Sequence, residues 1–256
     1  IVDAMKPKFI KQGQENGHDP KVLEKIWGDW EKFASYAFNK SHATCYSWVA
    51  YQTAYLKAHY PAEYMAALMT RRFAQITEIT KLMEECQSMN IKTLGPDVNE
   101  SYRAFGVNEH GEIRFGLSAI KGMGAPAADA IVAERQKNGP YKTIFDFAER
   151  VDFSCVNRKA FETLALSGGF DSFGIRREQF FGKNSKGETF LDTLVRYGQL
   201  FQREQQEAAT SLFGGTEAVE IATPPIPEVE GWSTIERLNR ERELVGIYLS
   251  AHPLDD

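Results

Sequence analysis

The sequence predicts a mainly α-helical protein, with a helical first segment, one small β-hairpin and then a tandem helix-hairpin-helix domain. Apolar residues recur at helical spacing along most of the 256 residues, whereas strict alternation is confined to residues 105–117. Hydrophobic residues make up 43% of the chain and aromatic residues 12%, so a packed core is expected. No apolar run approaches the roughly 18 residues that a membrane span needs.

Changes of pattern and composition predict where the chain divides. We expect a first domain over 1–116 and a hairpin domain over 117–208. A linker rich in Gly, Pro and Glu is expected over 209–231, and a last helix over 232–256.

Five helices are expected before the hairpin. In the second, Val22, Ile26 and Trp30 recur at helical spacing. In the fourth, Pro61 suits the first turn, where its missing N–H costs nothing. The expected helices span 4–17, 20–37, 42–58, 61–73 and 76–89.

Turn signals divide the remainder of the chain. Residues 108–111, Asn-Glu-His-Gly, join two alternating segments and indicate a β-hairpin. A helical block is expected over 117–170 and another over 176–208, which a polar loop at 182–187 interrupts. Residues 233–236, Ser-Thr-Ile-Glu, form a capping box that opens the last helix.

The net charge of −5 is unevenly distributed, which matters for nucleic-acid binding. Residues 200–256 hold 4 basic and 11 acidic side chains, whereas residues 1–199 hold 26 basic and 24 acidic ones. The acidity therefore belongs to the C-terminal part. The rest of the chain is close to neutral and permits a local basic face.

The patterns of common catalytic and metal sites are missing. There is no D-x-D, H-E-x-x-H, G-x-S-x-G or Walker motif, so no catalytic residue and no metal ligand is expected in this chain. Cys45, Cys86 and Cys155 lie far apart without a C-x-x-C pair, which favours thiols in a reducing cytoplasm. The chain opens at Ile1 without an initiator Met or a leader, and we interpret it as a piece of a longer protein.

A polar cluster precedes the third expected helix. Asn39, Lys40, Ser41 and His42 place an amide, an amine, a hydroxyl and an imidazole at the positive end of that helix. Free backbone N–H groups and the helix dipole favour a phosphate there, and Lys40 adds a full positive charge. The alternative is that Asn39 or Ser41 only caps the helix.

A glycine-containing turn carries the second candidate site, over Lys121, Gly122, Met123, Gly124 and Ala125. Two glycines permit a tight turn between short helices and the close approach of a phosphate to backbone amides. The turn is a helix-hairpin-helix signature, in which Met123 would anchor the loop in the core. Such a site binds the DNA backbone without reading bases. A purely structural Gly-x-Gly connector is the alternative.

A second hairpin is expected downstream, without its own Gly-x-Gly turn. Asn157 is the expected N-cap of its helix and Gly168 the residue that ends it. Arg158 and Lys159 in the first turn are candidate DNA contacts, or else a solvated charged pair.

Leu212 and Phe213 lie in the Gly-, Pro- and Glu-rich segment. Two adjacent apolar residues in a polar stretch are typical of a peptide that docks into a pocket of a partner. The alternative is that they pack back onto the chain itself.

Several segments resemble, in order, the bacterial DNA polymerase III alpha subunit family, the C-family of replicative polymerases. The longest stretch runs from Phe38 to Glu63, and within it residues 38–42, 51–53 and 56–63 match the family. The other resembling segments are 95–99, 114–117, 119–122, 169–171 and 246–254.

The resemblance implies the back part of a polymerase fingers domain, then tandem hairpins, and then a helix that precedes an OB-fold. Asn39, Lys40, Ser41 and His42 would contact the triphosphate of the incoming nucleotide. The hairpin around Gly122 would hold the primer-template duplex. The catalytic carboxylates and their Mg²⁺ ions would lie in the palm, outside this chain, so this chain alone is expected to be inactive.

The resemblance also implies partners. Leu212 and Phe213 would belong to a Gln-x-x-Leu-Phe motif for the bacterial sliding clamp, although Ala209 stands at the Gln position and removes a polar anchor. A tether of this kind raises effective concentration and therefore processivity. Other replicase subunits would bind through regions outside this chain, and the location would be cytoplasmic.

Two other interpretations stay open at the level of sequence. One is a stand-alone helix-hairpin-helix protein of DNA binding or repair, which would leave residues 38–65 unexplained. The other is a protein-interaction module that does not bind DNA.

Overall fold

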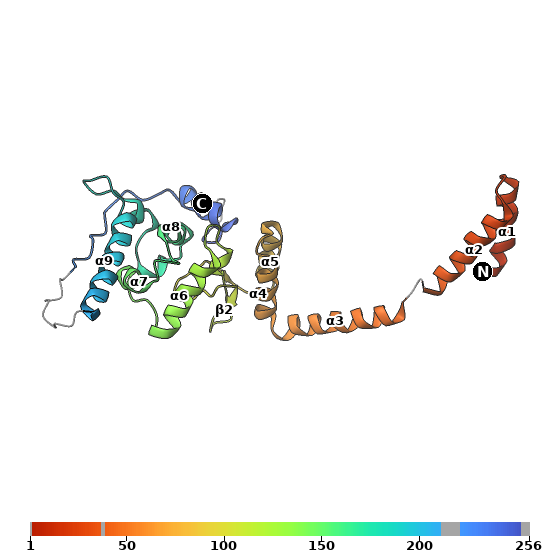
Figure 1. Ribbon diagram of the computed structural model, residues 1–256, viewed down its shortest axis with the longest axis horizontal. Helices are drawn as coiled ribbons and strands as arrows, with labels where there is room; N and C mark the ends of the chain where they lie inside the picture. Colours follow the sequence, from red (N-terminus) through yellow and green to blue (C-terminus); the bar gives the residue numbers. More distant parts are fainter. Residues whose placement is uncertain (1, 37–38, 211–220, 252–256) are drawn as a thin grey trace. The chain divides into compact units, whose positions relative to one another are not determined.

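The computed structural model describes residues 2–36, 39–210 and 221–251 of the chain, which divides into two compact units (Figure 1). The first unit is Ile1–His59 and the second is Tyr60–Asp256. The mainly helical fold class expected from the sequence is confirmed. No described helix combines the length and the apolar character that a membrane span requires.

The first unit is helical. It contains α1 (Val2–Glu15), α2 (Pro20–Tyr36) and α3 (Lys40–His59). Helices α1 and α2 pack together, and Leu23 and Trp27 are buried between them. The two helices approach closely at Gly13, where an added Cβ would stand 2.5 Å from a methyl of Leu23. Helix α3 has no buried side chain.

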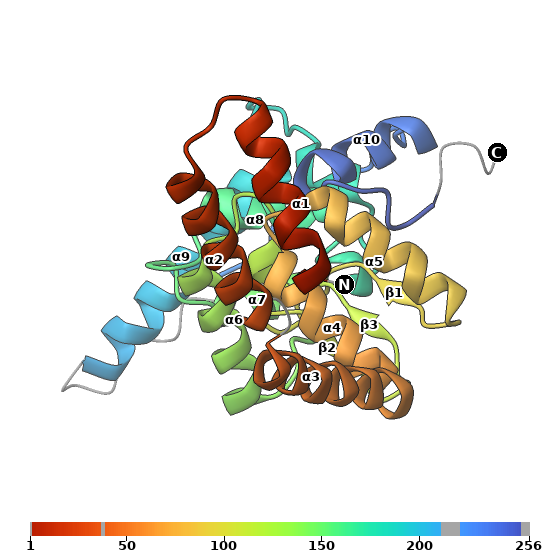
Figure 2. The same cartoon turned by 90° about the vertical axis from the view of Figure 1, so that its right-hand side faces the viewer.

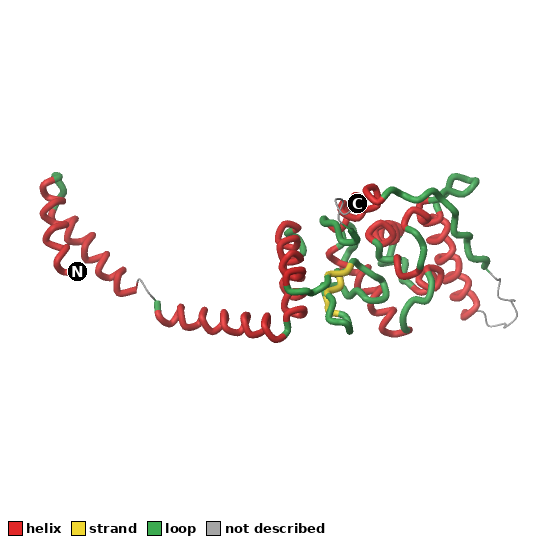
Figure 3. The backbone as a smooth tube through the Cα atoms, turned by 180° about the vertical axis from the view of Figure 1, so that it is seen from behind, coloured by secondary structure: helices red, strands yellow, loops and turns green. Residues whose placement is uncertain are grey.

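The second unit opens with two helices and a small sheet (Figure 3). These elements are α4 (Pro61–Arg72), α5 (Ile76–Ser88), β1 (Thr93–Leu94), β2 (Gly106–Val107) and β3 (Ile113–Arg114). The antiparallel β2–β3 pair confirms the expected hairpin, with Val107 opposite Ile113. Strand β1, which the sequence did not predict, adds to β3 in parallel, and the strand order is β1-β3-β2.

Further helices build most of the rest of the second unit. They are η1 (Leu117–Ala119), α6 (Ala125–Asn138), α7 (Ile144–Arg150), α8 (Arg158–Ser167), η2 (Asp171–Phe173), η3 (Arg177–Phe181), α9 (Phe190–Thr210) and α10 (Thr234–Val245). The loop expected at 182–187 closes with a bridge between Lys183 and Thr189.

One continuous core joins the sheet to these helices. Met65 and Met69 of α4 belong to the same buried cluster as Phe115, Leu117 and the aromatic rings of α7 and α8. The boundary expected between residues 116 and 117 therefore lies inside the second unit.

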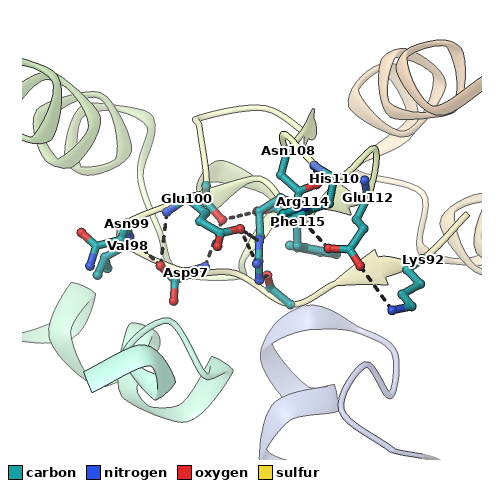
Figure 4. A network of polar contacts seen from close by, with 12 residues as sticks. Lys92, Asp97, Val98, Asn99, Glu100, Asn108, His110, Glu112, Arg114 and Phe115 are labelled. Carbon is teal, nitrogen blue, oxygen red and sulfur yellow. Dashed lines mark hydrogen bonds and ion pairs between the residues drawn. The ribbon is translucent and has the colours of Figure 1, made fainter. Parts of the chain in front are cut away.

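A polar network stiffens the loop that connects β1 to the sheet hairpin (Figure 4). Asp97 accepts hydrogen bonds from the amides of Asn99 and Glu100, at 2.7 and 3.2 Å. Arg114 of β3 donates from Nε to Glu100 at 3.0 Å and from Nη1 to the carbonyl of Gly95 at 3.0 Å. The loop is thus tied to β3 by side chains as well as by strand pairing.

Helix α10, drawn in blue in Figure 2, packs against α8. Ser233 caps α10 by accepting a hydrogen bond from the amide of Glu236 at 3.2 Å. Leu238 and Val245 are fully buried on the inner side of the helix. This last helix therefore contributes to the core of the second unit.

Candidate nucleic-acid interface

The candidate turn lies between η1 and α6. Gly122 has a φ of +92°, which L-residues rarely adopt, so glycine is required for the conformation. The side chains of Ile120 and Met123 on either side are buried, as expected for Met123. Gly122 and Gly124 themselves are exposed. The turn is therefore anchored in the core by its apolar side chains, whereas its glycines are open to solvent.

Backbone amides at this turn are available to a ligand. Gly124 is the N-cap of α6 and offers no side-chain cap. In the described part of the chain, the amides of Gly122, Gly124 and Ala125 have no acceptor. Exposed amides at the start of a helix favour a phosphate.

A hydrogen bond to α10, which the sequence did not predict, fixes the start of the turn. The amide of Lys121 donates to the carbonyl of Leu244, near the end of α10, at 2.8 Å. Lys121 directly precedes Gly122 in the chain and is exposed, and among the described residues no ion pair of its ammonium is found. It therefore adds positive charge to the turn.

The second hairpin has the expected ends. The side chain of Asn157 accepts from the amide of Ala160 at 3.1 Å, and Gly168 ends α8 with a φ of +88°. Local sequence chemistry therefore predicted both residues correctly.

The two cations of α8 differ in their partners. Arg158 donates from Nε to Asp192 of α9 at 2.6 Å and from Nη1 to Glu162 at 3.2 Å. The hydrogen bond that Arg158 donates to Asp192 is the main cause that raises the pKa of Arg158. Lys159 has a weaker pairing, with its Nζ 3.5 Å from Glu162, and 60% of its side chain is exposed.

Helix α8 meets the glycine turn directly. A Cβ added to Gly122 would stand 3.3 Å from Oγ1 of Thr163 and 4.0 Å from Cε of Lys159. The structure therefore brings Lys159 to the turn, whereas Arg158 is held by α9. Thr163 was missed in the sequence, because one threonine on a buried helix face gives no signal of a site.

In the first unit, Asn39 caps α3. Its side chain accepts from the amide of His42 at 3.0 Å, as the capping alternative anticipated. Lys40, Ser41 and His42 are exposed, and the ring of His42 lies 4.3 Å from that of Tyr46. Capping and phosphate contact are compatible, since the charged and hydroxyl groups stay open to solvent.

The remaining sequence predictions concern the Leu212–Phe213 pair and metal ligands. Leu212 and Phe213 lie outside the described residues. Within the described ranges, no three His, Cys, Asp or Glu side chains gather as a metal site would require.

The packed hairpins and the open glycine turn define a helix-hairpin-helix domain within the second unit. In agreement, the sequence profile of the helix-hairpin-helix motif matches residues 90–180. In sequence, the chain corresponds to one segment of the bacterial DNA polymerase III alpha subunit family.

Three relatives illustrate this similarity. The chain is 43% identical over 254 residues to DNA polymerase III subunit alpha of Chlamydia trachomatis. The aligned part covers 97% of this chain and 20% of the relative. Identity to DNA polymerase III subunit alpha of Pasteurella multocida is 38% over 252 residues, which cover 98% of this chain and 21% of the relative. Identity to the Treponema pallidum protein is 38% over 256 residues, with 100% and 21% covered. The chain thus spans about a fifth of the length of these relatives.

Proposed function

We propose that the second unit binds the backbone of duplex DNA at the Gly122 turn, as part of the alpha subunit of a bacterial replicative DNA polymerase. The observation that carries this proposal is the row of open amides at Gly122, Gly124 and Ala125. The match of residues 90–180 to the helix-hairpin-helix motif and the similarity to alpha subunits support it.

The proposed contact reads the backbone only. Amides of Gly122, Gly124 and Ala125 would donate to the oxygens of one phosphate, and Lys121 would offset its charge. Met123 would support the turn without touching the phosphate, since its side chain is buried and its amide donates to the carbonyl of Ile120 at 3.0 Å. Binding would therefore be independent of sequence and would weaken as salt rises, because neutralised phosphates release counterions.

Gly124→Val tests the phosphate contact. Gly124 has a φ of −71° and a ψ of 150°, which a residue with a side chain adopts readily. Among the described residues beyond its chain neighbours, an added Cβ would meet Pro126 at 3.6 Å, an ordinary contact distance. We expect an affinity loss of about tenfold for a random-sequence duplex at low salt, equal to about 1.4 kcal/mol, because the methyl groups cover the amides. Fluorescence anisotropy of a labelled duplex at several salt concentrations measures this loss.

Gly95→Val is the matched control, because a Cβ there has no heavy atom within 4 Å. It should bind like the wild type. Equal affinity of the Gly124→Val variant and the wild type would refute the phosphate contact. Absence of any salt-dependent binding by the wild type would favour the protein-interaction alternative.

Within the full polymerase, the first unit would contact the incoming nucleotide. The exposed groups of Lys40, Ser41 and His42 at the capped start of α3 suit a triphosphate. The Mg²⁺ ions and their carboxylates would come from other parts of the enzyme, so this chain alone would bind without catalysing. As in a bacterial replicase, the site of action would be the cytoplasm.

Leu212 and Phe213 would tether the polymerase to the sliding clamp. Replacing both by Ala should weaken clamp binding by about 2 kcal/mol or more, because buried apolar anchors dominate such peptide contacts. Surface plasmon resonance with immobilised clamp measures the loss, and Leu200→Ala, an exposed leucine of α9, serves as control. Undiminished clamp binding by the double variant would exclude this segment as the tether.

A further inference from the structure

We infer that the phosphate site of the first hairpin is completed by the second hairpin, through the Lys159 ammonium and the Thr163 hydroxyl of α8. This inference rests on the proposed DNA-backbone contact at the Gly122 turn. It makes the pair of hairpins one composite site and distinguishes Lys159 from its neighbour Arg158.

The Thr163 hydroxyl is the first observation. Thr163 is fully buried, and its Oγ1 has no hydrogen-bond partner among the described residues. Leaving a buried hydroxyl unpaired costs about 1–3 kcal/mol. Outside Gly122 and its two chain neighbours, Oγ1 is the described heavy atom nearest to the place where a Cβ of Gly122 would stand, at 3.3 Å. The hydroxyl is therefore directed at the turn that carries the open amides.

Lys159 is the second observation. Its Cε lies 4.0 Å from the same Cβ position, so the stem of this lysine runs past the turn. Its side chain is mostly exposed, and among the described residues its ammonium pairs with Glu162 alone, at 3.5 Å, a surface contact of small net energy. A phosphate bound over Gly122 and Gly124 would compete for this ammonium.

Arg158 provides the contrast that makes the inference specific. Two carboxylates, on Asp192 and Glu162, hold its guanidinium and connect α8 to α9. An arginine held in this way must lose strong hydrogen bonds before it can reach DNA. Adjacent cations of the same helix turn therefore have different functions: Arg158 stabilises the packing of α8 on α9, and Lys159 completes the phosphate site.

The chemistry assigns complementary tasks to the three parts of the site. The amides of the first hairpin donate to the phosphate oxygens, and Lys159 supplies a mobile charge from the second hairpin. The hydroxyl of Thr163 donates from beneath the turn through one water, and so gains the partner that it lacks among the described residues.

Duplex binding by the 256-residue chain tests the composite site. We expect Lys159→Ala to weaken binding about tenfold at low salt and to reduce the salt slope by about one counterion. Thr163→Val should weaken binding several-fold without lowering the melting temperature, because removing an unpaired hydroxyl leaves the packing intact. Thr163→Ser should restore affinity, and Arg158→Ala should bind within about twofold of the wild type while unfolding more easily.

The outcomes separate this inference from the proposed function. Weakened binding by Gly124→Val together with wild-type affinity of either Lys159→Ala or Thr163→Val would overturn the composite site and leave the amide contact standing. Full binding by Gly124→Val would instead remove the proposed contact. A larger loss for Arg158→Ala than for Lys159→Ala would also contradict the inference.

Discussion

Glu241→Ala is expected to destabilise the second unit by about 3–5 kcal/mol, because it removes the buried carboxylate that accepts from Arg177 and from two backbone amides. Asp171 still pairs with Arg177 in the variant, so the loss comes mainly from buried donors left without their acceptor. Glu241 is 1% exposed and accepts from Nη1 of Arg177 at 2.8 Å. Its other oxygen accepts from the amides of Leu249 and Ser250, at 2.7 and 2.9 Å. Urea unfolding followed by circular dichroism measures the loss.

Glu236→Ala on the same helix is the matched control. Glu236 makes an exposed i, i+4 pair with Arg240 and should change stability by only about 0.3–0.5 kcal/mol. A loss below about 1 kcal/mol for Glu241→Ala would mean that this network contributes little. Because α10 also accepts the amide of Lys121, the Glu241 variant should weaken the glycine turn as well.

The same carboxyl predicts sensitivity to acid. Burial by itself would raise the pKa of Glu241, but the Arg177 guanidinium and the two backbone amides lower it below the ordinary value of 4.5. A pKa that is lower in the folded state than in the unfolded state stabilises the fold above the unfolded value. This contribution is lost as the pH falls through the folded value. The Glu241→Ala variant should therefore lose less free energy of unfolding than the wild type when the pH falls from neutral to acidic.

Phe161→Ala is expected to cost about 3–5 kcal/mol, because it removes a fully buried ring from the centre of the hairpin core. The ring stacks on Phe153 at 5.8 Å and meets Phe147 edge-on at 5.3 Å. Phe170 packs against it at 6.1 Å. Neighbouring rings of this kind collapse poorly into a cavity, so the loss should lie at the upper end of core substitutions.

Ile235→Ala serves as the control for this core variant. Ile235 lies on α10 in the same unit and is 59% exposed, so its truncation should stay within about 0.5 kcal/mol of the wild type. Phe161→Leu should cost less than Phe161→Ala, because it leaves a smaller cavity. Equal stability of Phe161→Ala and the wild type would show that the aromatic cluster is not the centre of the core.

Features that depend on neighbours in the chain were predicted well. The N-caps at Asn157 and Ser233 and the glycine end at Gly168 follow from local hydrogen-bond chemistry and backbone freedom. The sheet hairpin around residues 108–111 follows from alternation and turn residues. The exposed turn at Gly122, with its buried Met123, was also predicted from the motif.

Features that depend on residues far apart in the sequence were not predicted. Strand β1 has two residues and exists because β3 pairs with it, so its own sequence carries no periodic signal. The sequence predicted a charged last helix but not that Glu241 in it is buried against Arg177, 64 residues earlier in the chain. Such pairs form only when packing brings both elements together.

By itself, the sequence determined the helices, their caps and the glycine turn, since each results from residues within a few positions of one another. It also carried the similarity to alpha subunits. Only the tertiary structure decided that Lys159, rather than Arg158, lies at the turn, and that Thr163 is directed at Gly122. The physical reason is that side chains of one helix turn point in different directions, and only the packing of α8 against its neighbours determines which of them faces the site.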